Sequence, residues 1–164
     1  MGSDTKIDET LKEYEKEMVK LDHETAIIIT KEGKVFSVVG EEGSVYFRNV
    51  GEDALNDTTV THNHPAKLTW YSFSKFDLGE LMDLRLKRIR GIDNKFIYEI
   101  ITDENTKFVD YQVIVHEYSD AAYKEFLEKR VQGLASMDDD EEFHEINKIL
   151  AKTYNYKYRR ISCE

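Results

Sequence analysis

The stretch THNHP, Thr61–Pro65, places two histidines one residue apart. In a β-strand, residues i and i+2 face the same side, so His62 and His64 would point together while Asn63 faces the opposite way. Pro65 cannot donate a hydrogen bond to a sheet, so we expect the strand to end there, with both imidazoles at its accessible rim. Two imidazoles on one side are common zinc ligands, and this spacing therefore favours a metal site.

A catalytic zinc site also requires a third protein ligand and a base. Asp77, near the start of the segment SKFDLGELMDLRLK, is the nearest candidate for the third ligand in the sequence. Glu24 opens the segment ETAIIIT and can act as the base if the sheet pairs this strand with the histidine strand. Cys163 is the only cysteine, so a metal ion here has to use histidine and carboxylate ligands.

The order of these elements resembles the JAB/MPN (JAMM) family of zinc metalloproteases. The family pattern is a glutamate on an early strand, then His-x-His-Pro, then Ser-x-x-Asp on the next helix, and this chain carries LDHETAIII, HNHP and SKFD in that order. The resemblance covers residues 4–102. In more detail, THNHP with FSKFDL, and the tail AKTYNYKYRR, are similar to the JAB-like domains of tailed-phage head-morphogenesis proteins and related mobile elements.

The resemblance implies a function and a role for each matching residue. It implies zinc binding by His62, His64 and Asp77, general acid/base catalysis by Glu24, and a hydrogen bond from Ser74 to the developing oxyanion. The implied reaction is hydrolysis of a peptide or isopeptide bond in a protein or peptide substrate, which includes ubiquitin-like conjugates and phage proteins. The implied fold is a cytidine-deaminase-like α/β fold, an α-β-α sandwich around a mixed central sheet, with an added C-terminal helical segment.

The chain departs from the family pattern in one place. Nine residues separate His64 from Ser74, more than is usual in the family, and the longer segment leaves Ser72 as an alternative to Ser74. Trp70, Tyr71 and Phe73 lie in this segment, where they either contact substrate or pack the loop onto the sheet.

Two other interpretations of the same residues stay open, and a third is disfavoured. Ser-x-x-Asp is a helix-capping pattern in its own right, with Ser74 as N-cap and Asp77 reaching back to it. A protein with this fold can also be a non-catalytic, phage-associated interaction module that retains the site as a relic. The letters HNH suggest a nuclease, but the nuclease motif of that name spreads its residues across a hairpin and a helix, and no such separated pattern occurs here.

The elements that must position these residues follow from the hydrophobic pattern. Apolar residues recur at helical spacing over residues 4–21, with Ser3 or Asp4 as N-cap. TAIIIT and KVFSVVG predict a hairpin whose first strand is buried, and SVYFRNV, TTVTH, RIRGI and KFIYEIIT predict further strands. SKFDLGELMDLRLK predicts a helix, and the two stretches FVDYQVIVHEYSDAAYKEFLEKRVQGLA and DDDEEFHEINKILAKTYN predict two more. We therefore expect a single domain with a catalytic core, 4–102, and a mostly helical extension, 106–164.

Composition limits the class of protein and its partners. The 164 residues are 40% hydrophobic and 34% charged, which is typical of one folded domain. The formal net charge of -10 repels a phosphate backbone, so nucleic acid is not expected as a partner despite the basic run RLKRIR. The sequence contains no apolar run long enough for a membrane span, and its N-terminus is too charged for a secretory signal, so we expect a cytoplasmic protein.

Overall fold

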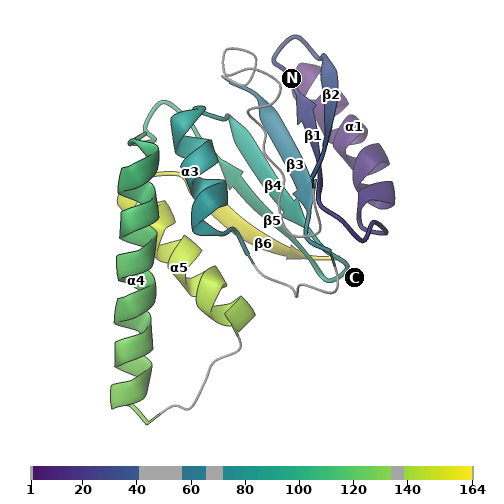
Figure 1. The fold of residues 1–164 in the computed structure, drawn as a ribbon. Coiled ribbons are helices and arrows are strands. Elements are labelled where there is room, and N and C mark those ends of the chain that lie inside the picture. The colour runs from purple at the N-terminus through teal and green to yellow at the C-terminus, as the bar shows by residue number, and fades with distance from the viewer. Residues whose placement is uncertain (1, 41–56, 66–71, 134–138, 164) are drawn as a thin grey trace.

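The chain folds into an α/β structure with helices on both faces of one sheet (Figure 1). The computed structural model describes residues 2–40, 57–65, 72–133 and 139–163. Within these ranges the elements are α1 (Gly2–Met18), β1 (Thr25–Ile29), β2 (Val35–Val39), β3 (Thr59–Asn63), α3 (Lys75–Asp83), β4 (Arg88–Ile92), β5 (Phe96–Ile101), α4 (Tyr111–Val131), α5 (Asp139–Tyr154) and β6 (Lys157–Ser162).

The sheet is mixed, and its strand order is β2-β1-β3-β4-β5-β6. Among the described strands, β3 and β4 pair in parallel and all other neighbours pair antiparallel. The central strands β1 and β3 are buried along their whole length, as expected for strands covered on both faces. The histidine strand β3 therefore lies between the strand that follows Glu24 and the strand β4.

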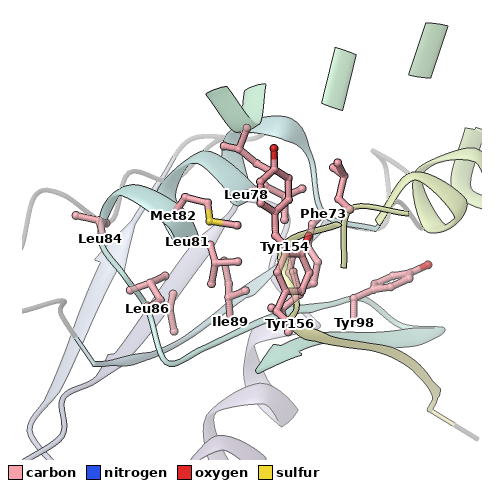
Figure 2. Close-up of a cluster of buried hydrophobic side chains, with 14 of the residues drawn as sticks. Phe73, Leu78, Leu81, Met82, Leu84, Leu86, Ile89, Tyr98, Tyr154 and Tyr156 are labelled. Atoms are coloured by element: carbon pink, nitrogen blue, oxygen red, sulfur yellow. The ribbon is translucent and has the colours of Figure 1, made fainter. Parts of the chain in front are cut away.

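Two apolar cores lie on opposite faces of the sheet. The smaller core joins α1 to the sheet through residues such as Leu11, Ile27 and Ile92. The larger core joins the sheet to α3, α4 and α5, which lie on the other face (Figure 1). Figure 2 shows part of this larger core, in which residues of α3 meet Tyr154 and Tyr156 from the C-terminal part of the chain.

The helices and strands agree with the sequence prediction in most places. The buried first strand, the hairpin with β2, and the strands RIRGI and KFIYEIIT are confirmed. The predicted strand SVYFRNV lies outside the described residues. No helix in the described part of the chain is both long enough and apolar enough to cross a membrane.

Three boundaries differ from the prediction. Helix α1 begins at Gly2, so Ser3 and Asp4 lie inside it and neither is its N-cap. It ends at Met18 rather than at residue 21. The prediction of a helical segment through the end of the chain was wrong for its last part, because Lys157–Ser162 forms strand β6 and pairs with β5.

Candidate metal centre

Three side chains with metal-binding atoms meet where β3 ends beside α3. The Nε2 atoms of His62 and His64 lie 3.0 Å apart, and His62 Nε2 lies 3.3 Å from Asp77 Oδ1. All three ligand atoms lie within 4.8 Å of one another. His62 is buried, whereas His64 and Asp77 are partly accessible. The structure therefore brings together the three residues that the sequence predicts as metal ligands.

Two of the three separations between these atoms are close to those of a tetrahedral zinc site. Zinc bonds to histidine nitrogen and carboxylate oxygen of about 2.0–2.2 Å place neighbouring tetrahedral donors roughly 3.3 Å apart. The two measured separations that involve His62, 3.0 Å and 3.3 Å, are close to this value. The donor set of two imidazoles and one carboxylate leaves one tetrahedral position for a water molecule or a substrate atom.

The end of β3 and a glycine on β4 set the positions of the two histidines. The backbone of His64 continues the ladder past the last residue of the strand, because its N–H donates to the Ile92 carbonyl at 2.7 Å. Gly91 pairs with His62 across the sheet. A Cβ atom at Gly91 would lie 3.2 Å from His64 Cε1, so the glycine leaves the space that the second imidazole occupies.

Asp77 fills the capping role and the ligand role at the same time. Its Oδ2 accepts hydrogen bonds from the Ser74 backbone N–H at 2.8 Å and from Ser74 Oγ at 3.1 Å, which closes a capping box at the start of α3. Its Oδ1 faces His62. Because a carboxylate has two oxygens, the capping interpretation and the ligand interpretation of Ser-x-x-Asp do not exclude each other.

The electrostatic environment favours an ionised Asp77 and a protonated His62. Burial opposes the charge of Asp77, but His62 and the hydrogen bonds from Ser74 outweigh it and hold the pKa of Asp77 far below its usual range. Burial likewise opposes protonation of His62, but Asp77, Glu24 and the backbone of Arg90 together raise its pKa. A positive charge is therefore favoured at the point where the three ligand atoms converge.

Glu24 lies at the edge of this cluster, immediately before β1. Ala26 pairs with His62 in the antiparallel ladder, so the register continued by two residues places Glu24 opposite His64. Burial raises the pKa of Glu24 to about 7, although His62 acts in the opposite direction. A carboxyl group that titrates near neutral pH suits a group that takes up and releases a proton.

Asn63, the residue between the two histidines, fixes the backbone on either side of Glu24. Its Oδ1 accepts from the Thr25 N–H at 2.7 Å, and its Nδ2 donates to the His23 carbonyl at 2.9 Å. The period of the strand predicts that Asn63 faces the side opposite to the histidines, and its sequence position suggests no role. This period gives only the side that Asn63 faces, and its contacts with the backbone beside Glu24 depend on the pairing of β1 with β3.

The structure separates the two serines that the sequence left as alternatives. Ser72 is buried, and its Oγ lies 2.7 Å from the Tyr158 hydroxyl, away from the ligand atoms. Ser74 is the N-cap of α3, and its Oγ bonds with Asp77 both as donor and as acceptor. Ser74 therefore adjoins the cluster, and in this arrangement its hydroxyl proton is held by Asp77.

The aromatic residues expected to contact substrate are only partly described. Trp70 and Tyr71 lie outside the described residues. Phe73 is fully buried, and its ring lies 6.2 Å from the ring of His62, centre to centre. Its side chain belongs to the larger core, which favours the packing interpretation over substrate contact for this residue.

Comparison with known proteins identifies no relative of this chain. Neither protein-family models, nor curated proteins, nor solved structures give a match. The JAB/MPN resemblance consequently depends on the motifs alone.

Proposed function

We propose that this chain is a zinc-dependent hydrolase of the JAB/MPN type that cleaves a peptide or isopeptide bond. The observation that carries the proposal is the convergence of His62 Nε2, His64 Nε2 and Asp77 Oδ1 beside a carboxyl group, that of Glu24, whose pKa is raised to about 7. A mixed sheet with helices on both faces supports the family assignment, because it agrees with the fold that the resemblance implies.

The proposed mechanism divides the work among the residues of the cluster. Zinc, when bound, supplies a Lewis acid that polarises the scissile carbonyl and lowers the pKa of its water towards roughly 7. Glu24 takes the proton from that water and delivers it to the leaving amine, for which a carboxyl group near its own pKa is well suited. Asp77 and the two histidines keep the ion in place.

Ser74 is the proposed donor to the oxyanion. Its hydroxyl group now donates to Asp77 Oδ2 at 3.1 Å, so a rotation about the Cβ–Oγ bond is needed to direct that proton to a substrate oxygen. The Ser74 backbone N–H can keep Asp77 in place during this rotation, because it bonds independently to the same carboxylate oxygen at 2.8 Å. The proposed substrates remain proteins or peptides, with ubiquitin-like conjugates and phage proteins among them.

The first experiment measures zinc per chain by elemental mass spectrometry on protein purified without an affinity tag. We expect about one zinc per chain, because the described residues contain one group of three suitable ligands. His64→Ala should remove it. His116→Ala is the matched control, because His116 is an exposed histidine on α4 that pairs with Asp120 and lies outside the cluster. A zinc content that His64→Ala leaves unchanged would contradict the proposed site.

The second experiment separates catalysis from metal binding. Glu24→Gln keeps the size of the side chain and removes its capacity to take up a proton. We expect the variant to retain zinc and to lose hydrolysis of peptide and isopeptide substrates that the parent cleaves, by at least the factor of roughly 100 typical of a general base. Turnover at the parent rate would rule out this mechanism.

A non-catalytic interaction module is the second candidate function. The complete capping box is compatible with it, since Ser74 and Asp77 satisfy each other without any metal. On this hypothesis the chain binds no zinc, and Asp77→Ala lowers the stability of the fold by roughly 1 kcal/mol through the loss of the cap alone. A chain without zinc favours this second function, whereas for a chain with zinc the Glu24→Gln experiment decides between the two.

A further inference from the structure

We propose that the C-terminal part of the chain, α4, α5 and β6, positions Asp77 in the metal centre by holding residues 72–74. Tyr118 on α4 and Asn147 on α5 are the main positioning residues, and Tyr158 on β6 supports them. This inference deepens the proposed function, because it assigns the C-terminal elements a role in the same site. It depends on that function only where metal binding is concerned.

The Phe73 carbonyl receives two hydrogen bonds from the C-terminal helices. The Tyr118 hydroxyl donates to it at 3.1 Å, and Asn147 Nδ2 donates to it at 3.0 Å. All three residues are buried. Two convergent donors fix the direction of this peptide group far more narrowly than packing of the Phe73 ring can.

Asn147 has an unfavourable buried atom, which indicates that its hydrogen bond to the Phe73 carbonyl is important. Its Nδ2 also donates to the Phe143 carbonyl one turn earlier, but its Oδ1 is buried and has no hydrogen-bond partner among the described residues. A buried acceptor without a partner is unfavourable, and a leucine of similar size would avoid it. What the asparagine provides in return is its donor to the Phe73 carbonyl.

A second connection holds the residue before Phe73. Ser72 Oγ lies 2.7 Å from the Tyr158 hydroxyl, which in turn lies 2.7 Å from His144 Nδ1. Burial and the nearby Arg160 lower the pKa of His144, so its ring is a neutral partner in this chain of hydrogen bonds. Ser72 and Phe73 are thus held from α4, α5 and β6 at once.

The residue after Phe73 transmits this placement to the site. Ser74 is the N-cap of α3, and its backbone N–H and hydroxyl both bond to Asp77 Oδ2. With Oδ2 held in this way, Oδ1 is the oxygen that faces His62. A rotation of the peptide at Phe73 would move the Ser74 N–H and release the carboxylate from this orientation.

Close packing of α3 on α4 supplies the fixed frame for these bonds. A Cβ atom at Gly79 would overlap the ring of Tyr111, so the two helices approach as closely there as a glycine permits. Figure 1 shows α4 beside α3 and α5 on the same face of the sheet. Because this packing prevents α3 from sliding along α4, the position of the first turn of α3 depends on the hydrogen bonds to residues 72–74.

The test uses Tyr118→Phe combined with Asn147→Leu, which removes both donors to the Phe73 carbonyl and keeps the side-chain volumes. Tyr156→Phe is the matched control, because the Tyr156 hydroxyl is buried in the same core and has no hydrogen-bond partner among the described residues. If the double variant fails to fold, Tyr118→Phe alone removes one donor and should give a smaller change in the same direction.

The first readout is hydrogen exchange in the metal-free protein. The amides of Ser74 and Asp77 both form the capping box, and we expect them to exchange about tenfold faster in the double variant than in the parent or in Tyr156→Phe. Unchanged exchange at both amides would overturn the inference, whether or not the chain binds metal.

The second readout is metal affinity, measured with zinc against a chromophoric chelator and with cobalt(II) by its visible spectrum. Loss of a residue that orients a ligand weakens binding by roughly 10- to 100-fold, so we expect about a tenfold loss and a changed cobalt spectrum in the double variant alone. Faster exchange with an unchanged affinity and spectrum would overturn the positioning role. If the parent binds no zinc, the proposed function fails. The exchange experiment still tests whether the C-terminal elements fix the position of residues 72–74.

Discussion

On the face of the sheet that α1 covers, three arginines surround Glu99, whereas on the opposite face two histidines and two carboxyl groups converge at the end of β3. Glu99 is fully buried, and its two oxygens accept hydrogen bonds from Arg88, Arg90 and Arg159 at 2.6–2.8 Å. We call these four residues, together with Glu15, the arginine cluster. In it, every buried carboxylate oxygen faces a cation within the chain.

Arg90 connects the arginine cluster to α1. Its guanidinium donates to Glu15 Oε1 at 2.7 Å and to Glu15 Oε2 at 3.0 Å, while its third nitrogen donates to Glu99. Thr61, the neighbour of His62 on β3, completes the shell with a hydrogen bond to Glu15 at 2.8 Å. Such mutual compensation is what a buried structural ion cluster requires.

The candidate metal centre is arranged differently, because the Nε2 atoms of two histidines and Asp77 Oδ1 lie close to one point. His62 and His64 present nitrogen atoms to each other at 3.0 Å, and Glu24 is held where burial raises its pKa to about 7. The comparison shows that burial of charge does not by itself indicate function. On one face each buried carboxylate oxygen faces a guanidinium, whereas on the other face two imidazole nitrogens and a carboxylate oxygen converge on one point.

The largest expected effect comes from breaking the arginine cluster. Arg90→Met leaves the buried Glu15 and Glu99 partly uncompensated, and we expect the free energy of unfolding to fall by about 3–5 kcal/mol. The measurement is urea denaturation at pH 7. Zinc content per folded chain should not change, since Arg90 supplies no ligand atom to the metal centre.

Arg159→Met is the matched control for this prediction. Its side chain is 59% exposed, so its removal from the same Glu99 should cost no more than about 1 kcal/mol. If both variants lose the same free energy of unfolding, the contribution of each arginine to stability does not depend on how deeply that arginine is buried.

Acid should weaken the arginine cluster through Glu99. Burial raises the pKa of Glu99, but Arg88 and Arg90 outweigh burial and hold the pKa below its usual value of 4.5. The unfolded chain therefore binds a proton more readily than the folded chain, so the stability from Glu99 is present above about pH 4.5 and is lost as pH falls through the folded-state pKa.

Urea midpoints at pH 7 and at pH 3.5 measure this loss. We expect Glu99→Gln to be less stable than the parent at pH 7 and to lose less stability between the two pH values. Glu104→Gln, at an exposed glutamate, should keep the acid sensitivity of the parent. If Glu99→Gln and the parent respond equally to acid, Glu99 is not the group that titrates.

A smaller effect is expected where the sheet adjoins the metal centre. Gly91→Ala places a Cβ atom 3.2 Å from His64 Cε1 and 3.3 Å from the Phe73 ring, so one neighbour has to move by a few tenths of an ångström. We expect His64 to move, because its side chain is partly accessible whereas Phe73 is fully buried. Zinc affinity should then fall about tenfold, which chelator competition measures.

The outcome at Gly91 also tests the comparison between the two faces. A loss of stability of about 1 kcal/mol or more with unchanged zinc affinity would show that Phe73, and not His64, had moved. The glycine would then serve core packing, as Ile92 beside it does on the opposite face.

Much of the candidate site follows from local rules. The period of two along a strand predicts that His62 and His64 share a face, and the capping pattern predicts where α3 begins. Whether a capping carboxylate can also face a candidate metal site does not follow from spacing, because the two oxygens of Asp77 are assigned by contacts with Ser74 and with His62 from different elements.

The parts that the sequence did not predict depend on distant partners. Strand β6 contains Lys157, Arg159 and Arg160, which resemble a solvated basic run more than a strand. Arg159 lies opposite Glu99 in the ladder and forms an ion pair with it, and Arg160 pairs with Glu141 on α5. Charges on an edge strand obscure the hydrophobic alternation that identifies a strand, and their partners are not visible until the sheet is assembled.

The smallest expected effect concerns Tyr156, a polar group on the same face as the metal centre but without a role in it. Its hydroxyl is buried with no hydrogen-bond partner among the described residues, and burial raises its pKa, so it stays neutral. Removing a buried polar group that has no partner relieves a desolvation cost, and Tyr156→Phe should change the free energy of unfolding by between zero and about 1 kcal/mol in favour of the folded state.

Thermal unfolding of Tyr156→Phe beside Tyr118→Phe makes this a direct comparison of two buried tyrosines in one core. Tyr118 donates to the Phe73 carbonyl, so its loss should lower the free energy of unfolding by about 1 kcal/mol. A destabilised Tyr156→Phe would mean that its hydroxyl does have a partner, and the residue would then join the hydrogen-bonded groups that support the site. If Tyr156→Phe is more stable than the parent, burial on the face of the candidate metal site does not by itself identify a functional polar group. The feature that distinguishes Tyr118 from Tyr156 is then its hydrogen bond to residues 72–74.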